Sequence, residues 1–287
     1  MKLIAAPDLD TRIPEYRLPD NACDTHCHVF GPAEDFPYAA TRRYTPPDAS
    51  KRQLSALHNK LGVGRAVIVQ ASCHGTDNSA MLDAIASSQG RYRGVCNATE
   101  SFSDDHFEEL HAGGIRGVRF NFVKHLGGPP SLEKLDAIVS RVKHLPWHVE
   151  LHFDAKDILE FEGIIDSIPL PVVIDHMGRV PVSDGIGQAP FQSLLRKLSD
   201  SDALWVKLSG SERISAAGPP FLDAAPFGAA CVAAAPNRCI WGTDWPHPNV
   251  RIMPNDGDLV DVIPTMIPDP ALQRKVLVDN PARLFGF

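Results

Sequence analysis

Eight short runs of mainly β-branched and apolar residues recur along the chain, and segments with apolar residues at helical spacing lie between them. Strands that alternate with helices form a parallel sheet, because each helix carries the chain back to the start of the next strand. Eight such units in about 250 residues are typical of a closed barrel. The sequence therefore predicts an α/β fold, a (β/α)8 TIM-type barrel, with strands at residues 22–30, 66–70, 93–98, 116–122, 148–153, 172–176, 204–209 and 239–243.

An open, doubly wound sheet is the alternative fold for the same order of elements. Its usual mark, a G-x-G-x-x-G turn, does not follow the first run. No linker rich in Pro, Gly or Ser divides the chain, so we expect one barrel domain over residues 1–287, with residues 1–20 as an N-terminal extension. Residues 31–50 and 246–268 are expected to form long loops at the mouth of the barrel.

Composition narrows the classes of function. A net charge of -7 and the lack of a basic segment argue against nucleic acid or an anionic membrane as a partner. No run approaches the roughly 20 apolar residues of a membrane span, and the start has too short an apolar run for a signal peptide, so we expect a cytoplasmic protein. The six cysteines are widely spaced and are expected to be reduced; only Cys73, beside His74, is kept open as a reactive group.

Five polar side chains fall at the ends of predicted strands. His26 and His28 end the first strand, where residues two apart point to the same side. His152, His176 and Asp244 end the fifth, sixth and eighth strands. Taken singly, each histidine could be a hydrogen-bonded rim residue, and Asp244 could be a helix cap. The C-terminal ends of barrel strands meet at one mouth, so we expect the five side chains to share one site.

The chemistry of this set points to hydrolysis at a metal. Three imidazoles and one carboxylate around an open coordination position form a hydrolytic metal site. Zinc is the default ion for nitrogen and oxygen ligands, with manganese and iron as alternatives, and it lowers the pKa of a bound water towards about 7. His176 is then the spare imidazole that polarises a carbonyl or passes a proton. Asp244 both contacts the metal and orients or deprotonates the water.

Four segments resemble, in the same order, motifs of the amidohydrolase superfamily. The resemblance is greatest to the branch that contains 2-pyrone-4,6-dicarboxylate hydrolase and 4-sulfomuconolactone hydrolase, and it covers nearly the whole chain. It implies a (β/α)8 barrel and hydrolysis of an anionic unsaturated lactone formed when bacteria degrade aromatic compounds. The segments are Asp24–Gly31, Val69–Asn78, Asp175–Arg179 and Trp241–Asn249.

The resemblance also implies roles for individual residues. Asp244 corresponds to the group that activates water, and His26, His28 and His176 to groups that polarise the lactone carbonyl. One substrate position has independent support, because Arg119 ends the predicted fourth strand and arginine is the natural bidentate partner of a carboxylate; a rim salt bridge is the alternative. The positions that hold substrate are Tyr44, Ser72, Arg119, Arg213 and Asn249.

Two positions depart from the pyrone hydrolase that the chain resembles, which has arginine where His125 stands and tyrosine where His152 stands. Loss of the arginine removes a carboxylate clamp, and we expect His125 to face the substrate in its place. Gain of His152 completes the metal set of the zinc-dependent members, His26, His28, His152 and Asp244. Both departures favour an enzyme that converts 4-sulfomuconolactone to maleylacetate and sulfite with one divalent metal, zinc first and manganese second.

Three other functions stay open. The chain could be a 2-pyrone-4,6-dicarboxylate lactonase, or a zinc-dependent non-oxidative decarboxylase, which uses the same arrangement of histidines and aspartate. A barrel that binds a metal or ligand without catalysis is the third. The expected partner is a small anionic lactone, with no nucleic acid and no membrane, and the sequence leaves a homo-oligomer open.

Overall fold

A computed structural model describes residues 2–287, except for the side chain of His125. All eight predicted strands are present and form one parallel sheet in the order β10-β9-β8-β7-β6-β5-β4-β2. The spatial order follows the chain, because each right-handed crossover places a strand beside the one before it. The strands are β2 (Cys23–Cys27), β4 (Arg65–Val69), β5 (Tyr92–Cys96), β6 (Ile115–Asn121), β7 (His148–His152), β8 (Val172–Ile174), β9 (Leu204–Leu208) and β10 (Cys239–Trp241).

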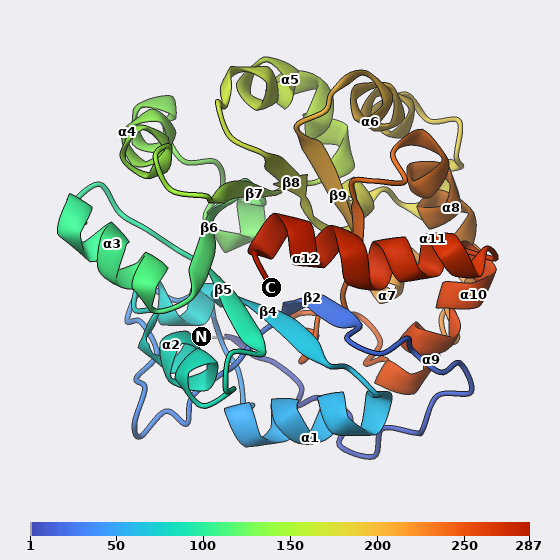
Figure 1. Ribbon diagram of the computed structural model, residues 1–287, viewed down its shortest axis with the longest axis horizontal. Coiled ribbons are helices and arrows are strands. Elements are labelled where there is room, and N and C mark those ends of the chain that lie inside the picture. Colours follow the sequence, from blue (N-terminus) through green and yellow to red (C-terminus); the bar gives the residue numbers. More distant parts are fainter. Residues whose placement is uncertain (1) are drawn as a thin grey trace.

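Helices form a ring outside the strands, and the last one crosses in front of them in the view of Figure 1. In the fourth helix the residues buried against the sheet have helical spacing, as predicted. The main helices are α1 (Lys51–Leu61), α2 (Ser79–Ala86), α3 (Asp104–Ala112), α4 (Leu132–Val142), α5 (Ile158–Ser167), α6 (Ala189–Asp200) and α8 (Ala225–Ala234). Shorter ones are α7 (Ser211–Ile214), α9 (Asp256–Asp261), α10 (Ile263–Met266), α11 (Pro270–Arg274) and α12 (Asn280–Phe285), with single turns η1 (Ser72–His74), η2 (Lys124–Leu126), η3 (Ala155–Asp157), η4 (Asp175–Arg179), η5 (Val182–Asp184), η6 (Leu222–Ala224) and η7 (Lys275–Asp279).

The barrel closes between its edge strands, β2 and β10. The Thr25 hydroxyl donates to the carbonyl of Trp241 at 2.8 Å, and the amide of Asp244 donates to the carbonyl of His26 at 2.7 Å. Gly242 permits this approach, since a Cβ there would lie 2.6 Å from the backbone nitrogen of His26. This closure confirms the predicted (β/α)8 barrel. It also makes the first and last barrel strands neighbours at the mouth.

Strands β2, β8 and β10 end two or three residues before their predicted ends. His28, His176 and Asp244 therefore lie in turns and not on strands. His176 has φ +52° and Asp244 has φ +68°, a left-handed conformation that is uncommon for residues other than glycine. These turns carry the side chains over the mouth, and such backbone is often found at functional sites.

The interior of the barrel is layered along its axis. An apolar cluster fills part of the interior, and α12 lies across the strands (Figure 1) and contributes Phe285 to this cluster. The ring of Phe285 meets that of His148, at the start of β7, with centroids 5.1 Å apart. The next positions along the strands carry charged side chains, described below. The cluster consists of Cys23, Val67, Val69, Val95, Val173, Trp205, Ile240 and Phe285.

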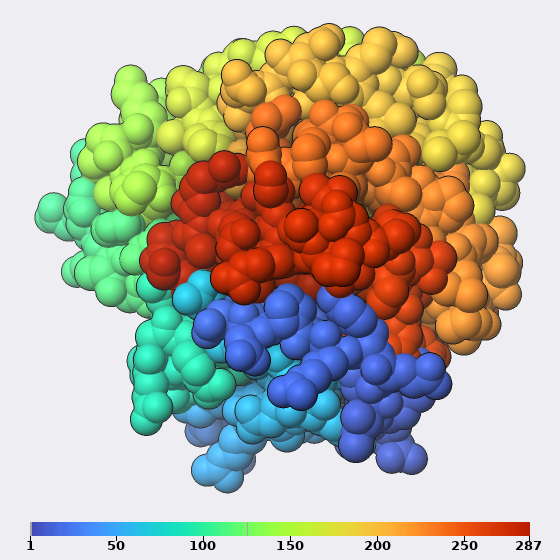
Figure 2. Space-filling view, turned by 45° about the vertical axis from the view of Figure 1, so that its right-hand side comes forward, coloured from blue at the N-terminus to red at the C-terminus, as the bar shows by residue number. Residues whose placement is uncertain are grey.

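The two segments that were expected to be loops contain some secondary structure. Residues 31–50 contain β3 (Tyr44–Thr45), which pairs in parallel with β1 (Lys2–Leu3) of the N-terminal extension. The prediction of a loop over residues 246–268 is wrong in part, because α9 and α10 both lie there. Arg12 of the extension donates to Asp258 of α9 at 2.7 Å, and Figure 2 shows the N-terminal segment beside the C-terminal one. Within residues 2–287, no helix is both long and apolar enough to cross a membrane.

Candidate active site

A small cavity lies at the C-terminal ends of the strands, where the predicted site residues meet. Ten of those residues have described side chains, and nine of the ten line the cavity. His26 is fully buried beside it, while the side chain of His125 lies outside the described part of the structure. The nine are His28, Tyr44, Ser72, Arg119, His152, His176, Arg213, Asp244 and Asn249.

His26, His28 and Asp244 converge at the closing seam of the barrel. The rings of His26 and His28 are 5.1 Å apart between centroids. Asp244 Oδ1 lies 3.3 Å from His28 Nε2 and 3.7 Å from His26 Nε2. Neither Asp244 Oδ1 nor His26 Nε2 has a hydrogen-bond partner among the described residues, although both are buried. Buried polar atoms without partners are costly, so this corner calls for a bound group.

The protonation of His28 shows which kind of group fits. His28 Nδ1 lies 2.8 Å from the carbonyl of Val69, and a carbonyl only accepts, so Nδ1 carries the hydrogen. In the neutral ring, Nε2 then presents a lone pair to the lone pairs of Asp244 Oδ1. Two such acceptors at 3.3 Å repel each other unless a cation or a proton lies between them. The donor set of imidazole nitrogens and a carboxylate oxygen suits zinc or a similar divalent ion.

His176 and His152 extend the same group of rings. One ligand atom from each of His26, His176 and Asp244 lies within 4.8 Å of the other two. His152 lies beside His176, with the centroids of the two rings 5.3 Å apart. Its Nε2 lies 3.3 Å from Nη1 of Arg179. His176 is therefore as well placed for a metal as the predicted fourth ligand, His152, and the division of roles between them stays a prediction.

The electrostatics of the site favour neutral imidazoles and an ionised carboxylate. Burial lowers the pKa of His176 to about 3, and burial with the charge of Lys207 lowers the pKa of His26 well below 6.5. Burial alone raises the pKa of Asp244, but the Arg213 guanidinium and the neighbouring histidines together outweigh it and hold that pKa well below its usual range. Free imidazole lone pairs and a carboxylate are the forms that bind metal or accept a proton.

The two predicted substrate arginines already have carboxylate partners. Arg213 donates through Nε to Asp244 and through Nη1 to the carbonyl of Pro248 at 3.1 Å. Arg119 donates to Asp175 Oδ2 through Nε at 3.0 Å and Nη2 at 2.8 Å. Arg119 lies inside β6 and not at its end, so it reaches the cavity from below. Both side chains are mostly buried, and both guanidinium groups contribute to the floor of the site.

A buried charged layer below the cavity was missed from the sequence. Lys207 on β9 is ion-paired with Glu150 on β7 and lies 3.1 Å from His26 Nδ1 and 3.6 Å from Asp175 Oδ1. All four side chains are fully buried. The sequence did contain a sign of this layer, since Lys207 and Glu150 are charged residues within predicted apolar strands. Lys and Glu are almost never fully buried unless they are paired. Lys207 and Asp175 both contact His26 and so position its ring.

A second missed group lies behind Arg213. His247 is buried between two carboxylates, with Nε2 3.1 Å from Asp256 Oδ1 and Nδ1 3.5 Å from Glu212 Oε1. Glu212 Oε1 in turn lies 3.6 Å from Arg213 Nε. This chain of charges supports the guanidinium that holds Asp244. Burial acts to lower the pKa of His247, but Asp256 and Glu212 raise it to about 10.

The raised pKa of His247 predicts a loss of stability at alkaline pH. An unfolded histidine has a pKa of about 6.5, so between pH 6.5 and 10 only the folded state keeps this proton. The contribution is fully present below pH 6.5 and is lost as the pH rises through 10, at up to about 1.4 kcal/mol per pH unit. Urea unfolding at pH 6.5 and 9 should show this decline in the wild type and a smaller one in His247→Gln. The exposed control His144→Gln should keep the wild-type decline; equal declines in all three proteins would refute the assignment.

Cys73, kept open as a reactive group, is buried and does not line the cavity. Burial raises the pKa of its thiol to about 12. The thiolate, not the thiol, is the nucleophile, so Cys73 is a packing residue.

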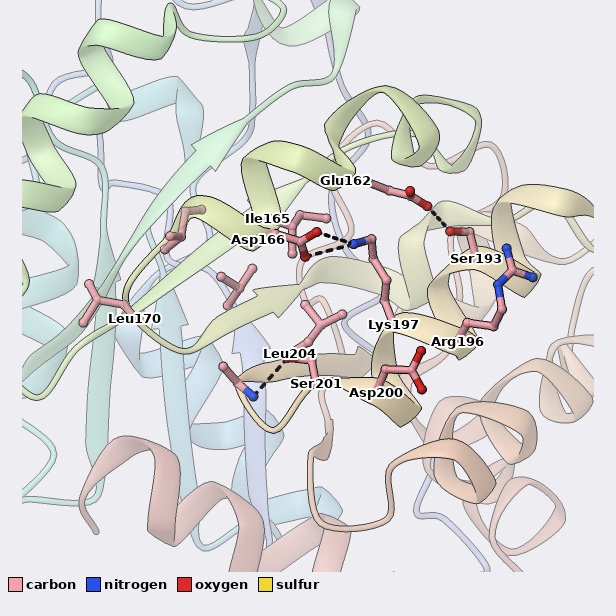
Figure 3. Close-up of a pocket in the computed structure, with 13 residues that line it drawn as sticks. Glu162, Ile165, Asp166, Leu170, Ser193, Arg196, Lys197, Asp200, Ser201 and Leu204 are labelled. Atoms are coloured by element: carbon pink, nitrogen blue, oxygen red, sulfur yellow. Dashed lines mark hydrogen bonds and ion pairs between the residues drawn. The ribbon is translucent and has the colours of Figure 1, made fainter.

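A larger groove between α5 and α6 is no candidate for the site (Figure 3). Two of its side-chain contacts are internal: Lys197 Nζ lies 2.9 Å from both carboxylate oxygens of Asp166, and Ser193 donates to Glu162. The groove adjoins Val172 and Leu204 where β8 and β9 begin, at the opposite end of the strands from the cavity described above. Active sites of such barrels lie at the C-terminal ends.

Comparisons with known proteins show similarity to lactone hydrolases over nearly the whole chain. The chain is 47% identical over 281 residues to 2-pyrone-4,6-dicarboxylate hydrolase from Comamonas testosteroni, over 95% of this chain and 92% of that protein. It is 42% identical over 278 residues to 4-sulfomuconolactone hydrolase from Rhizobium radiobacter, over 94% and 92% of the two chains. The crystal structure of a probable 2-pyrone-4,6-dicarboxylic acid hydrolase from Acinetobacter baumannii, with citric acid bound, superposes with a TM-score of 0.82 at 31% identity, over 93% and 100% of the two chains.

The model of the family described as Amidohydrolase matches residues 23–287, from the first barrel strand to the last residue. This range contains every residue of the cavity and both charged groups behind it. By this match and by the extent of its similarity to the hydrolases, the chain belongs to the amidohydrolase family.

Proposed function

We propose that this amidohydrolase opens an anionic unsaturated lactone, with 4-sulfomuconolactone as the first candidate and maleylacetate and sulfite as the products. The observation that carries the proposal is the position of Asp244 Oδ1, which lies 3.3 Å from His28 Nε2 and 3.7 Å from His26 Nε2, with a ligand atom of His176 within 4.8 Å of both Asp244 and His26. Two buried arginines, Arg119 and Arg213, line the same cavity and suit an acidic substrate. The relatives named above as hydrolases of two such lactones support the same class of substrate.

We propose a divalent metal in this corner, zinc first and manganese second. His26, His28 and Asp244 would hold it, with His152 as the predicted fourth ligand. When bound, such an ion supplies a Lewis acid that polarises a carbonyl and lowers the pKa of a water towards about 7. The unpaired His26 Nε2 and Asp244 Oδ1 support this choice, as does the lone pair that His28 presents to the carboxylate.

The residues of the chain divide the work of ring opening. Asp244, oriented by Arg213, accepts a proton from the water whose oxygen adds to the lactone carbonyl carbon. His176, whose Nδ1 lies 2.9 Å from the Ser209 hydroxyl, presents Nε2–H to the carbonyl oxygen when Ser209 donates to Nδ1. Collapse of the adduct breaks the bond between the carbonyl carbon and the ring oxygen. The proton held by Asp244 then passes to that oxygen, so the ring opens, and the new carboxylic acid loses its remaining proton to solvent. With 4-sulfomuconolactone the freed hydroxyl and the sulfonate share one carbon; the C–S bond then breaks with its electron pair on sulfite, the hydroxyl loses its proton, and the ketone of maleylacetate forms.

Removal of metal tests the proposed ion. Dialysis against a chelator should lower kcat at least about 100-fold, since the metal stabilises several kcal/mol of developing charge. Metal analysis before dialysis should show about one equivalent of zinc or manganese, and adding that ion back should restore both activity and the original Tm. Protein that holds no metal and keeps its turnover after chelation would remove the metal from the proposal.

A second candidate substrate is 2-pyrone-4,6-dicarboxylate. The higher identity to the hydrolase named for it, 47% against 42%, favours it, whereas the histidines at positions 125 and 152 favour the sulfonated lactone. Ultraviolet absorbance follows opening of either ring, and a sulfite assay detects only the opening of 4-sulfomuconolactone. The better substrate is the one with the higher kcat/KM; turnover of neither would reject the proposed function.

We also propose the cytoplasm as the compartment of this enzyme. All six cysteines are free and buried in the structure. Unpaired thiols are typical of reducing compartments. Determination of the free thiol content in protein purified without reductant tests this point, with six thiols expected.

A further inference from the structure

The cavity with the catalytic residues is too small for the substrate that the proposed function requires. Its volume is about 30 Å³, which is room for about one or two water molecules. A lactone ring with two acidic groups is several times larger. The substrate must therefore extend into neighbouring space or displace side chains.

A second cavity, here called the adjoining cavity, provides that space. It has a volume of about 420 Å³, within the range of small-molecule sites. It shares Arg179, Arg213 and Asn249 with the catalytic cavity, so the two spaces meet along these side chains. The polar residues of the adjoining cavity that concern us are Arg179, Ser183, Arg213, Ser215, Asn249 and Arg251.

The charge on the walls of the adjoining cavity is positive. The lining contains three arginines, Arg179, Arg213 and Arg251, and one carboxylate, that of Glu212. This carboxylate already lies beside His247. Walls with an excess of positive charge attract anions and raise their local concentration. An acidic group is therefore the chemistry that this cavity accepts.

Arg179 is the least committed of the buried arginines. It donates through Nε to Asp154 at 2.9 Å and through Nη1 to His152 Nε2 at 3.3 Å, which uses two of its five N–H groups within the described residues. By contrast, Arg119 and Arg213 each have a fully buried carboxylate partner, while Asp154 is 34% exposed. The free N–H groups of Arg179 lie at the border of the two cavities.

We propose that the adjoining cavity is a subsite for a second acidic group of the substrate, and that Arg179 selects substrates with that group. The inference rests on the proposed function, because the second acidic group is that of the lactone. Arg179 supplies a guanidinium to both cavities from the turn after β8. The first acidic group remains beside Arg119 and Arg213. Arg251, which is exposed, lies at the outer edge of the subsite.

Steady-state kinetics with matched lactones test the subsite. Arg179→Gln should raise KM for 2-pyrone-4,6-dicarboxylate by about 10- to 100-fold, as for loss of a hydrogen bond to a charged group, with kcat changed less than about threefold. For the same ring with a single carboxylate, KM should change less than about threefold. Arg179→Lys, which keeps the charge without the fork, should restore part of the difference. Arg196→Gln on α6, which lines neither cavity, should match the wild type.

Binding of citrate separates failure of the subsite from failure of the proposed function. Calorimetry needs no turnover, and citrate offers several carboxylates. The wild type and Arg196→Gln should bind citrate with equal Kd, Arg179→Gln at least about tenfold more weakly, and the exposed Arg251→Gln about two- to fivefold more weakly. An equal loss of kcat with one-acid and two-acid lactones would make Arg179 a positioning residue for His152 and overturn the proposal. Unchanged citrate binding in both Arg179→Gln and Arg251→Gln would overturn it as well, whether or not the enzyme opens lactones.

Discussion

Replacement of Asp244 by asparagine should lower kcat for lactone hydrolysis by about 1,000-fold. A positioned general base contributes about 10²- to 10⁴-fold, and asparagine cannot accept the proton of the attacking water. Asp244 is ionised at neutral pH because Arg213 and the neighbouring histidines together hold its pKa well below the usual range against the effect of burial. KM should change little, since Arg119 and Arg213 remain to contact the acidic substrate. Steady-state kinetics on the purified variant measure both constants.

The matched control is Asp200→Asn, the same change at an exposed position on α6. It should keep wild-type kcat and Tm. Asp244→Asn should remain folded by circular dichroism, although its Tm should fall because Arg213 loses a buried partner. A folded Asp244→Asn protein with normal kcat and weaker metal binding would instead support a barrel that binds metal without catalysis.

The architecture of the barrel is predictable from the sequence because it depends on local patterns. Each predicted strand is a run of apolar residues between helical segments, and each such run became a strand of the sheet. The mouth followed from the same pattern, because parallel strands bring their C-terminal ends together. Nine of the ten described residues predicted for the site line one cavity for this reason.

All eight strand ends were predicted one to three residues too late, and for β2, β8 and β10 the physical reason is visible. In a run such as 172–176, the apolar residues 172–174 favour a strand, and the prediction carried that strand on through residue 176. The backbone instead turns at His176 and Asp244 into left-handed conformations that ordinary residues seldom adopt. Tertiary contacts outweigh the local preference there: the amide of Asp244 donates to the carbonyl of His26 across the seam of the barrel. Such a contact joins residues at opposite ends of the chain and leaves no local mark.

The charged layer below the site escaped prediction because its partners are distant in sequence. Lys207 and Glu150 are 57 positions apart and belong to strands that are not neighbours in the sheet. A pattern of alternation shows that each points into the barrel, but not which charges meet there. Arg179 is a similar case: its motif was recognised, yet its position between two cavities depends on the turn after β8.

The charged layer predicts a large loss of stability when its lysine is replaced by an apolar residue. Lys207→Met should lower the free energy of unfolding by about 3–5 kcal/mol, the cost of leaving a buried charge without its partner. Lys207 is completely buried, and its ammonium is ion-paired with Glu150 and lies 3.6 Å from Asp175. Without it, two buried carboxylates share the charge of Arg119 alone. Urea unfolding at pH 7 measures the difference.

Lys197→Met is the matched control, because Lys197 pairs with Asp166 at 2.9 Å on the outer surface (Figure 3). Asp166 is 66% exposed, and exposed pairs contribute about 0–1 kcal/mol, so this variant should stay within that range of the wild type. The double variant Lys207→Met/Glu150→Gln should regain part of the lost stability, because it removes an unpaired charge along with its partner.

The same double variant separates two functions of the layer. If Lys207 only balances charge, restoring neutrality should restore both stability and kcat. Lys207 Nζ also lies 3.1 Å from His26 Nδ1, so it helps to position that ring. Loss of this contact leaves Asp175, 3.2 Å from the same nitrogen, as the partner that sets the ring. We therefore expect stability to recover more fully than kcat, and a double variant that regains neither would mean that the layer acts through packing and not through charge.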